Sequence, residues 1–268
     1  MSIMELACKP IDRPVIVTIC GDAGRGKTSL AAAFPKPIFI RAEDGMQAIP
    51  ADKRPDAFPL LQSANQLWEQ ITAIIHEPHD YQTLVIDSVT ALERLFLADV
   101  MAQDQKAKSI NQALGGYGAG PAAIAAMHQR VRKGAGLANE KRGMHVVFVA
   151  HADVETLKLP DVDDYMRWTL RLPSKSQPPY VDDVDVVGFL RLVTYTKGED
   201  GDRKKAISTG DLELVCHAVA ANVSKNRFGI TEPLEYRLGE NPLARVVPAL
   251  GAAAQTKTEI TNNEGEAE

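Results

Sequence analysis

The chain has few cysteines and no long apolar run. Its 268 residues include three cysteines, Cys8, Cys20 and Cys216, which lie far apart in the sequence. A zinc site or a disulfide framework requires paired spacing, so this pattern indicates reduced, intracellular thiols. No apolar run approaches the roughly 20 residues of a membrane span, and the first residues have no signal-peptide pattern. We therefore expect a soluble, cytoplasmic protein that does not bind membranes.

An excess of positive charge is also missing. Thirty lysines and arginines stand against 35 aspartates and glutamates, which gives a net charge of −5. This balance excludes a protein that coats nucleic acid by bulk electrostatics, but it allows a local basic groove. Hydrophobic residues make up 45% of the chain and charged residues 24%, so the composition is that of a globular protein with a sizeable core.

The order of apolar segments predicts a single α/β domain over residues 14–250. Buried strands are expected at 14–20, 36–45, 83–88 and 145–151, helices at 27–34, after Ser63, after Ser88 and from Pro121, and a β-hairpin around 197–202. The polar stretch 152–182 is expected to be a loop, and 212–220 fits either a strand or a short helix. Residues 1–13 are expected to form an arm and 251–268 a disordered acidic tail.

A glycine-rich turn follows the first strand. The segment "GDAGRGKTS" fits the P-loop pattern, in which backbone N–H groups surround the phosphates of a nucleotide, the lysine adds a positive charge and the Thr28 hydroxyl binds Mg²⁺. The alternative is a turn that only joins a strand to a helix. The predicted nucleotide-binding residues are Gly21, Asp22, Ala23, Gly24, Arg25, Gly26, Lys27, Thr28 and Ser29.

Polar residues end three of the other predicted strands. Asp87 ends "LVIDS" and is expected to hold the Mg²⁺ shell, with capping of the next helix as the alternative. Glu43 in "IFIRAEDG" is a candidate for orienting the water that attacks ATP, and Asp44 competes with it for that role. His151 ends "VFVAH" and is a candidate contact of the γ-phosphate, although a histidine there can also be structural.

The order of these motifs resembles the RecA-like ATPase core. The later segment "SKNRFG", residues 224–229, is similar to the Lys-Asn-Arg-Phe-Gly signature of the RadA branch, and the resemblance covers roughly residues 14–230. The chain has neither the four-cysteine zinc module nor the protease-like domain of RadA proteins. It therefore looks like the compact phage ATPases of the Sak-four single-strand-annealing group.

The resemblance implies specific roles. Glu43 matches the water-activating glutamate and His151 the polar sensor of the RecA-like family. Lys225 and Arg227 match fingers that reach into the nucleotide site of a neighbouring subunit, whereas in isolation "KNR" would be a solvated basic turn. Fingers that act in trans imply a homo-oligomeric ring or filament.

The resemblance also places single-stranded DNA at residues 99–121 and 152–182. Basic residues interleaved with aromatics suit single strands, although ordinary surface charges and core aromatics are the alternative. The candidate DNA contacts are Lys106, Lys108, Tyr117, Arg130, Arg132, Lys158, Arg167, Arg171 and Lys175.

These observations lead to one expected function and two alternatives. We expect a phage-encoded recombination or annealing protein of the bacterial host cytoplasm that binds single-stranded DNA, hydrolyses ATP with Mg²⁺ and has a single-strand-binding protein as a further partner. The first alternative is a RecA-like ATPase that regulates or assembles a protein partner. The second is an annealing protein that uses ATP structurally with little turnover.

Overall fold

The computed structural model describes residues 13–197 and 205–251. The expected arm and acidic tail lie outside the described residues, apart from Arg13 and Gly251, and so does most of the turn expected at 197–202. Within the described residues, no helix combines the length and the apolar character needed to cross a membrane.

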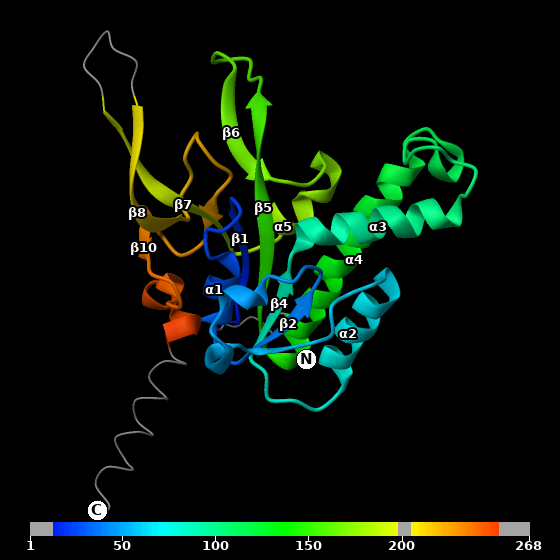
Figure 1. The fold of residues 1–268 in the computed structure, drawn as a ribbon, viewed down its shortest axis with the longest axis horizontal. Helices are drawn as coiled ribbons and strands as arrows, with labels where there is room; N and C mark the ends of the chain where they lie inside the picture. Colours follow the sequence, from blue (N-terminus) through cyan, green and yellow to red (C-terminus); the bar gives the residue numbers. More distant parts are fainter. Residues whose placement is uncertain (1–12, 198–204, 252–268) are drawn as a thin grey trace, which may run out of the picture.

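A mixed sheet runs through the centre of the molecule (Figure 1). Its strand order is β10-β8-β7-β1-β5-β4-β2-β3, with β6 paired to β5 and β9 paired to β7. The strands are β1 (Ile16–Gly21), β2 (Pro37–Arg41), β3 (Asp56–Ala57), β4 (Thr83–Asp87), β5 (His145–Leu157), β6 (Tyr165–Leu170), β7 (Val186–Lys197), β8 (Lys205–Val215), β9 (Lys225–Asn226) and β10 (Leu234–Tyr236). The strands from β7 to β3 along this order run parallel to one another, and at one edge β8 pairs antiparallel with β7 and β10 pairs antiparallel with β8.

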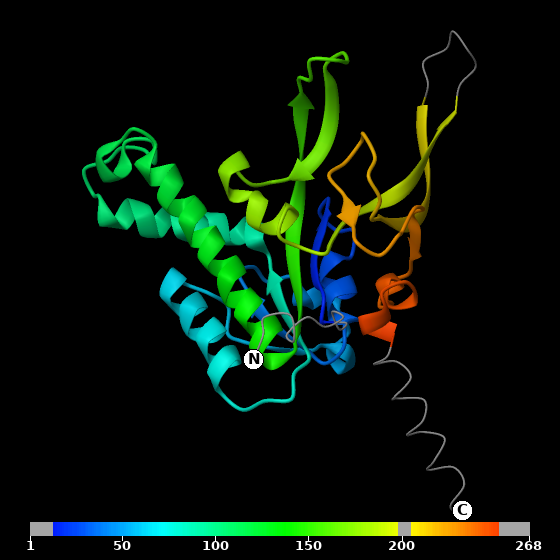
Figure 2. The same cartoon turned by 180° about the vertical axis from the view of Figure 1, so that it is seen from behind.

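Helices cover both faces of the sheet. The α-helices are α1 (Lys27–Ala32), α2 (Ala64–His76), α3 (Val89–Gln103), α4 (Ala119–Arg142) and α5 (Pro178–Val181), and the short 3₁₀ helices are η2 (Met46–Ala48), η3 (Ala51–Lys53), η4 (Ala113–Gly115), η5 (Ser174–Ser176) and η6 (Pro242–Arg245). Figure 2 shows α2, α3 and α4 together on one side of the sheet, while α1 and η6 lie on the other.

Alternation along the strands supplies the two hydrophobic cores. In β2, Ile38 and Ile40 face the core beneath α2, α3 and α4, and Phe39 faces the core beneath α1 and η6. Because successive side chains of a strand point to opposite faces, a continuous apolar run is what a strand covered on both faces requires. This architecture confirms the predicted fold class: a largely parallel sheet, helices on both faces and an antiparallel hairpin at one edge.

Helix starts follow local capping chemistry. The predicted N-cap of α2 is confirmed, since the Ser63 hydroxyl accepts a hydrogen bond from the Gln66 backbone N–H. The helix predicted from Pro121 begins two residues earlier, at Ala119, because Gly118 adopts a left-handed conformation with φ of 83° and turns the chain into the helix. Pro121 then lies in the first turn, where its missing N–H has no helical partner to lose.

The loop predicted at 152–182 is wrong. The fifth strand continues past His151 to Leu157 and pairs in antiparallel register with β6, so that a hairpin projects from the sheet (Figure 1). The ambiguous segment 212–220 is a strand as far as Val215, where β8 ends.

Candidate functional site

The carboxyl ends of β1, β2 and β4 meet at one edge of the sheet, beside His151 in the middle of β5. In register, Gly21 of β1 lies opposite His151 of β5, and Asp87 of β4 lies opposite both Val149 of β5 and Arg41 of β2. This alignment brings the P-loop, the end of β4 and the histidine to the same edge. Ligands of open parallel sheets bind outside that edge.

The P-loop forms as its pattern predicts. Gly24 and Gly26 have φ angles of 72° and 87°, in the left-handed region that favours glycine, and α1 begins directly afterwards at Lys27. The buried Lys27 donates from Nζ to the carbonyl oxygen of Asp22 at 2.9 Å, so its ammonium group is held inside the loop. Burial is the main cause that lowers the pKa of Lys27, while Cys20, Asp87 and Glu43 oppose the shift.

Asp87 lies directly beside the hydroxyl expected to bind Mg²⁺. The Thr28 Oγ1 donates to Asp87 Oδ2 at 2.8 Å, and the carboxylate is buried. Burial raises the pKa of Asp87 to about 6. The N-cap of α3 is Ser88, whose hydroxyl accepts from the Ala91 backbone N–H, so Asp87 is not the capping residue and the alternative role is excluded.

A hydroxyl and a carboxylate in this arrangement fit a magnesium ion. Both offer oxygen ligands, and Mg²⁺ is usually held by one or two such protein groups together with water and phosphate oxygens. A side chain at position 45 would crowd the pair, because a Cβ on Gly45 would lie 3.1 Å from Thr28 Oγ1. The donor set therefore fits the predicted cation, which would neutralise phosphate charge when bound.

Glu43 and His151 contact each other across the pocket. His151 Nε2 lies 2.8 Å from Glu43 Oε1, and a carboxylate only accepts, so Nε2 carries the proton. This hydrogen bond is the main cause that lowers the pKa of Glu43. The competitor, Asp44, instead pairs with Arg41 at 3.5 Å. Of the two carboxylates, Glu43 is therefore the one held against the histidine.

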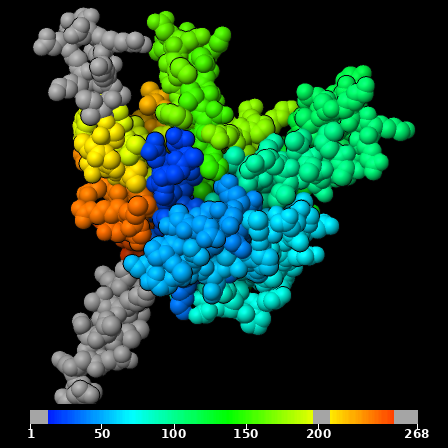
Figure 3. Space-filling model, in the orientation of Figure 1, coloured from blue at the N-terminus to red at the C-terminus, as the bar shows by residue number. Residues whose placement is uncertain are grey.

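These side chains surround one cavity of about 870 Å³, a size suited to a bound small molecule. Its lining residues are Ala23, Gly24, Gly26, Lys27, Thr28, Ser29, Ala32, Ala33, Glu43, Asp44, Gly45, Ala48, Ile49, Pro50, Lys53, Asp87, His151, Leu238 and Gly239. Figure 3 shows the P-loop region, in blue, at the surface between the segment around residue 50, in light blue, and the C-terminal segment, in orange.

Sequence reasoning missed the outer walls of this cavity. The Tyr236 hydroxyl donates to the Gly26 carbonyl oxygen at 3.0 Å, and Leu238 packs so closely on Gly26 that an added Cβ would lie 2.6 Å from its Cδ2. These residues are more than 200 positions away from the P-loop in sequence. Their local pattern carries no signal that would have revealed the contact.

The structure does not bring Lys225 and Arg227 to this cavity. Lys225 of β9 pairs with Val187 near the start of β7, and that end of β7 lies beside the start of β1, opposite the P-loop. Lys225 Nζ donates to the Asp182 carbonyl oxygen at 2.7 Å, and Arg227 lies 3.5 Å from the Asp185 carboxylate. Both expected fingers therefore face away from the nucleotide pocket of their own chain.

The candidate DNA contacts are spread over three regions. Tyr117 is fully exposed in the α3–α4 connection, which also carries Lys106 and Lys108. Arg130 lies over the Trp68 ring at 4.2 Å, whereas Arg132, on the same helix, donates to the Asp183 carbonyl oxygen, so the two do not form one cluster. On the β5–β6 hairpin, Lys158 pairs with Asp164 and Arg167 with Glu155. Arg171 and Lys175 follow this hairpin.

A family defined by an AAA domain matches residues 13–228, which is well over half of the chain. The chain belongs to this family. It is thus a member of a P-loop ATPase family, in agreement with the cavity that the P-loop, Asp87 and Glu43 surround.

The chain was also compared with curated proteins and with solved structures. No curated protein matches the chain. Among the solved structures that resemble it is the crystal structure of the RadB recombinase, with a TM-score of 0.48 and 13% identity over 85% of this chain and 91% of that one. A likeness of this degree identifies neither a substrate nor a partner.

Proposed function

We propose that this AAA-domain ATPase is a recombination or annealing protein of the RadA and phage Sak-four type, which binds single-stranded DNA and hydrolyses ATP between copies of itself. One observation carries the proposal. The pocket contains the P-loop lysine, a candidate Mg²⁺ site and a candidate base. The two cations of the "SKNRFG" segment, Lys225 and Arg227, lie at the opposite end of the sheet. A second chain, docked head to tail, would supply them.

The pocket residues support a direct hydrolysis step. A water oxygen bonds to the γ-phosphorus as the bond from that phosphorus to the β–γ bridging oxygen breaks, and ADP leaves with the electron pair. The proton of the water passes to the Glu43 carboxylate, which its low pKa keeps ionised beforehand. Lys27, and in trans Arg227, would stabilise the charge that develops on the phosphoryl oxygens.

Two exposed surfaces suit single strands. Tyr117 is fully exposed on the loop before α4, and Trp168 and Met166 are exposed on the β5–β6 hairpin, with exposed fractions of 39% and 69%. The Tyr117 and Trp168 rings can stack on bases without selecting their sequence, and Met166 adds apolar surface beside Trp168. His151 lies at the pocket on the same strand that continues into the hairpin, and its carbonyl oxygen accepts from the Arg171 backbone N–H at 2.8 Å. Loss of the γ-phosphate would thus be transmitted to the hairpin.

The test is the ATPase rate measured with and without single-stranded DNA. Stimulation by the DNA is expected. Turnover that DNA leaves unchanged would favour the regulator of a protein partner, and negligible turnover with intact strand annealing would favour structural use of ATP.

Glu43→Gln serves as the control within the same experiment. The amide keeps the shape of the side chain but does not accept the proton, so ATP binding should persist while hydrolysis falls by about a hundredfold or more. Normal hydrolysis by this variant would show that Glu43 is not the base.

A further inference from the structure

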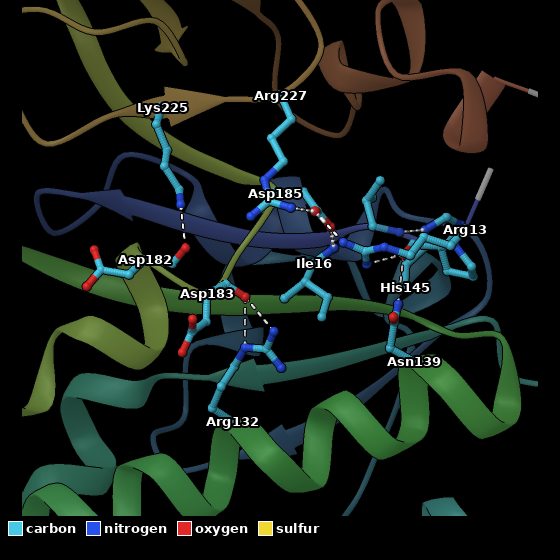
Figure 4. A network of polar contacts seen from close by, with 12 residues as sticks. Arg13, Ile16, Arg132, Asn139, His145, Asp182, Asp183, Asp185, Lys225 and Arg227 are labelled. Atoms are coloured by element: carbon cyan, nitrogen blue, oxygen red, sulfur yellow. Dashed lines mark hydrogen bonds and ion pairs between the residues drawn. The ribbon is translucent and has the colours of Figure 1, made fainter. Parts of the chain in front are cut away.

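Cations from several elements meet around residues 182–185 (Figure 4). This face lies at the end of the sheet opposite the P-loop. Arg13 precedes β1, Arg132 belongs to α4, Lys225 to β9, and Arg227 follows β9. All of them contact one short segment, residues 182–185, which joins α5 to β7. The chain thus gathers, on one surface, positive charges that are far apart in sequence.

Three groups of the segment hold the four cations, and Arg13 and Arg227 share one of them. Lys225 donates to the carbonyl oxygen of Asp182, and Arg132 donates to the carbonyl oxygen of Asp183 at 3.0 Å. Only Asp185 uses its carboxylate, which lies 2.6 Å from Arg13 and 3.5 Å from Arg227. A backbone carbonyl orients a cation without neutralising it, and the Asp182, Asp183 and Asp185 carboxylates nearby offset part of the charge of Lys225 and Arg132.

Asp185 itself is fixed in place. Its side chain is only 6% exposed, and its Oδ2 accepts from the Ile16 backbone N–H at 2.9 Å. Its own backbone N–H donates to the Ile16 carbonyl oxygen at 2.8 Å. The carboxylate is therefore tied to the first residue of β1. The side chain of Arg227, by contrast, is 59% exposed, so its guanidinium remains accessible to another molecule.

We propose that Asp185 is a positioning residue, which holds Arg227 on this face ready for the triphosphate bound by a second copy of the chain, with Lys225 and Arg132 beside it. The inference rests on the proposed sharing of the ATP site. A long, exposed arginine loses rotamer freedom whenever it binds, and a buried carboxylate that orients it beforehand lowers that cost. Of Asp185 and Arg227, only Arg227 would touch phosphate.

The first variant is Asp185→Asn. Its amide oxygen still accepts from the Ile16 N–H, but the charge that attracts both Arg13 and Arg227 is lost. We expect kcat to fall by about tenfold or more, while the affinity of the variant's own pocket for a fluorescent ATP analogue remains unchanged. The matched control, Asp80→Asn, removes the same charge from an exposed pair with Lys36 at 2.8 Å and should leave kcat unchanged.

Mixing separates positioning from a general structural defect. Lys27→Ala has a disabled pocket but an intact Arg227, and Asp185→Asn has an intact pocket. In an equal mixture, random assembly pairs an intact pocket with an intact finger at about a quarter of the head-to-tail interfaces. The mixture should therefore recover about a quarter of the wild-type rate. Arg227→Lys keeps a cation but loses the planar fork that a carboxylate orients. It should show the same loss and the same recovery.

The outcomes are distinguishable. Wild-type kcat in Asp185→Asn overturns the positioning role. If Asp185→Asn loses nucleotide affinity, its fold is disturbed and Arg227→Lys becomes the deciding variant. A wild-type kcat in Arg227→Lys would then overturn the positioning role of Asp185. An inactive Arg227→Ala that Lys27→Ala does not rescue would instead refute the shared site itself, and with it the proposed function.

Discussion

Two carboxylates of the pocket have pKa values shifted in opposite directions by their surroundings. The hydrogen bond from His151 lowers the pKa of Glu43, whereas burial raises that of Asp87 to about 6. Such divergence is typical of sites in which one acid acts as a base and another has a different task. Glu43 is ionised and can accept a proton at neutral pH. Burial disfavours the charged form of Asp87, and a bound cation would stabilise that charge.

A buried histidine outside the pocket gives the chain a pH-dependent stability. His145 begins β5, its Nδ1 accepts from the Val15 backbone N–H at 3.1 Å, and burial lowers its pKa from 6.5 to about 4. The folded state excludes a proton that the unfolded chain accepts. The stability from this group is therefore complete above pH 6.5 and is lost as the pH falls towards 4, by about 3 kcal/mol in total.

His145→Asn should remove this dependence, because the amide oxygen can replace Nδ1 as acceptor and the amide does not titrate. Urea unfolding at a series of pH values between 4 and 7 would measure it. His76→Gln, which removes an exposed histidine from the end of α2, should keep the wild-type pH dependence. Parallel pH curves for the wild type and His145→Asn would contradict the assignment.

At the scale of elements, strong burial patterns made strands predictable. The strands that end at Gly21, Arg41 and Asp87 are covered on both faces, so each is a continuous apolar run with a polar residue or glycine at its end. The β6 strand was missed because Tyr165, Met166 and Arg167 lie on a projecting hairpin and are not buried by a core. Without one buried face, a strand has no period of two to detect.

The residues of the candidate site also differ in how far the sequence predicts them. The P-loop follows a predicted strand, and Asp87, Glu43 and His151 lie at the ends of three others, so the sheet register brings them together as their positions in sequence suggest. The walls formed by residues 236–239 depend on a contact across the fold, and no local pattern specifies it.

That C-terminal wall should contact the base side of a bound nucleotide. Leu238 is 69% exposed and lines the cavity together with Ser29 and Ala33 of the α1 segment. Leu238→Ala should weaken ATP binding by about fivefold through lost apolar contact, and leave the binding of inorganic tripolyphosphate unchanged. Calorimetric titration would compare the two ligands, with Leu159→Ala, an exposed leucine on the β5–β6 hairpin, as the control. Equal weakening for both ligands would mean that Leu238 acts by shaping the P-loop.

At the scale of the whole molecule, two candidate sites lie at opposite ends of the sheet. The nucleotide pocket lies at the carboxyl end of β1, and the cation face around Asp185 lies at its amino end. Contacts between unlike surfaces of identical chains are heterologous, and their repetition produces a ring or an open filament. If the ATP site is shared as proposed, each chain supplies the pocket at one end and the cations at the other.

The rate per chain should therefore depend on protein concentration. At high dilution, where single chains dominate, the specific ATPase activity should rise in proportion to concentration and then level off as the interfaces fill. Added salt should move this rise to higher concentration, because the contact joins cations to phosphates across a screened surface. Activity and mass would be measured on the same dilution series, with Arg227→Ala showing no rise. A specific activity that stays constant over a hundredfold dilution, in samples whose mass is that of a single chain, would require a complete site within one chain, and the opposite placement of Lys225 and Arg227 would then have no role in turnover.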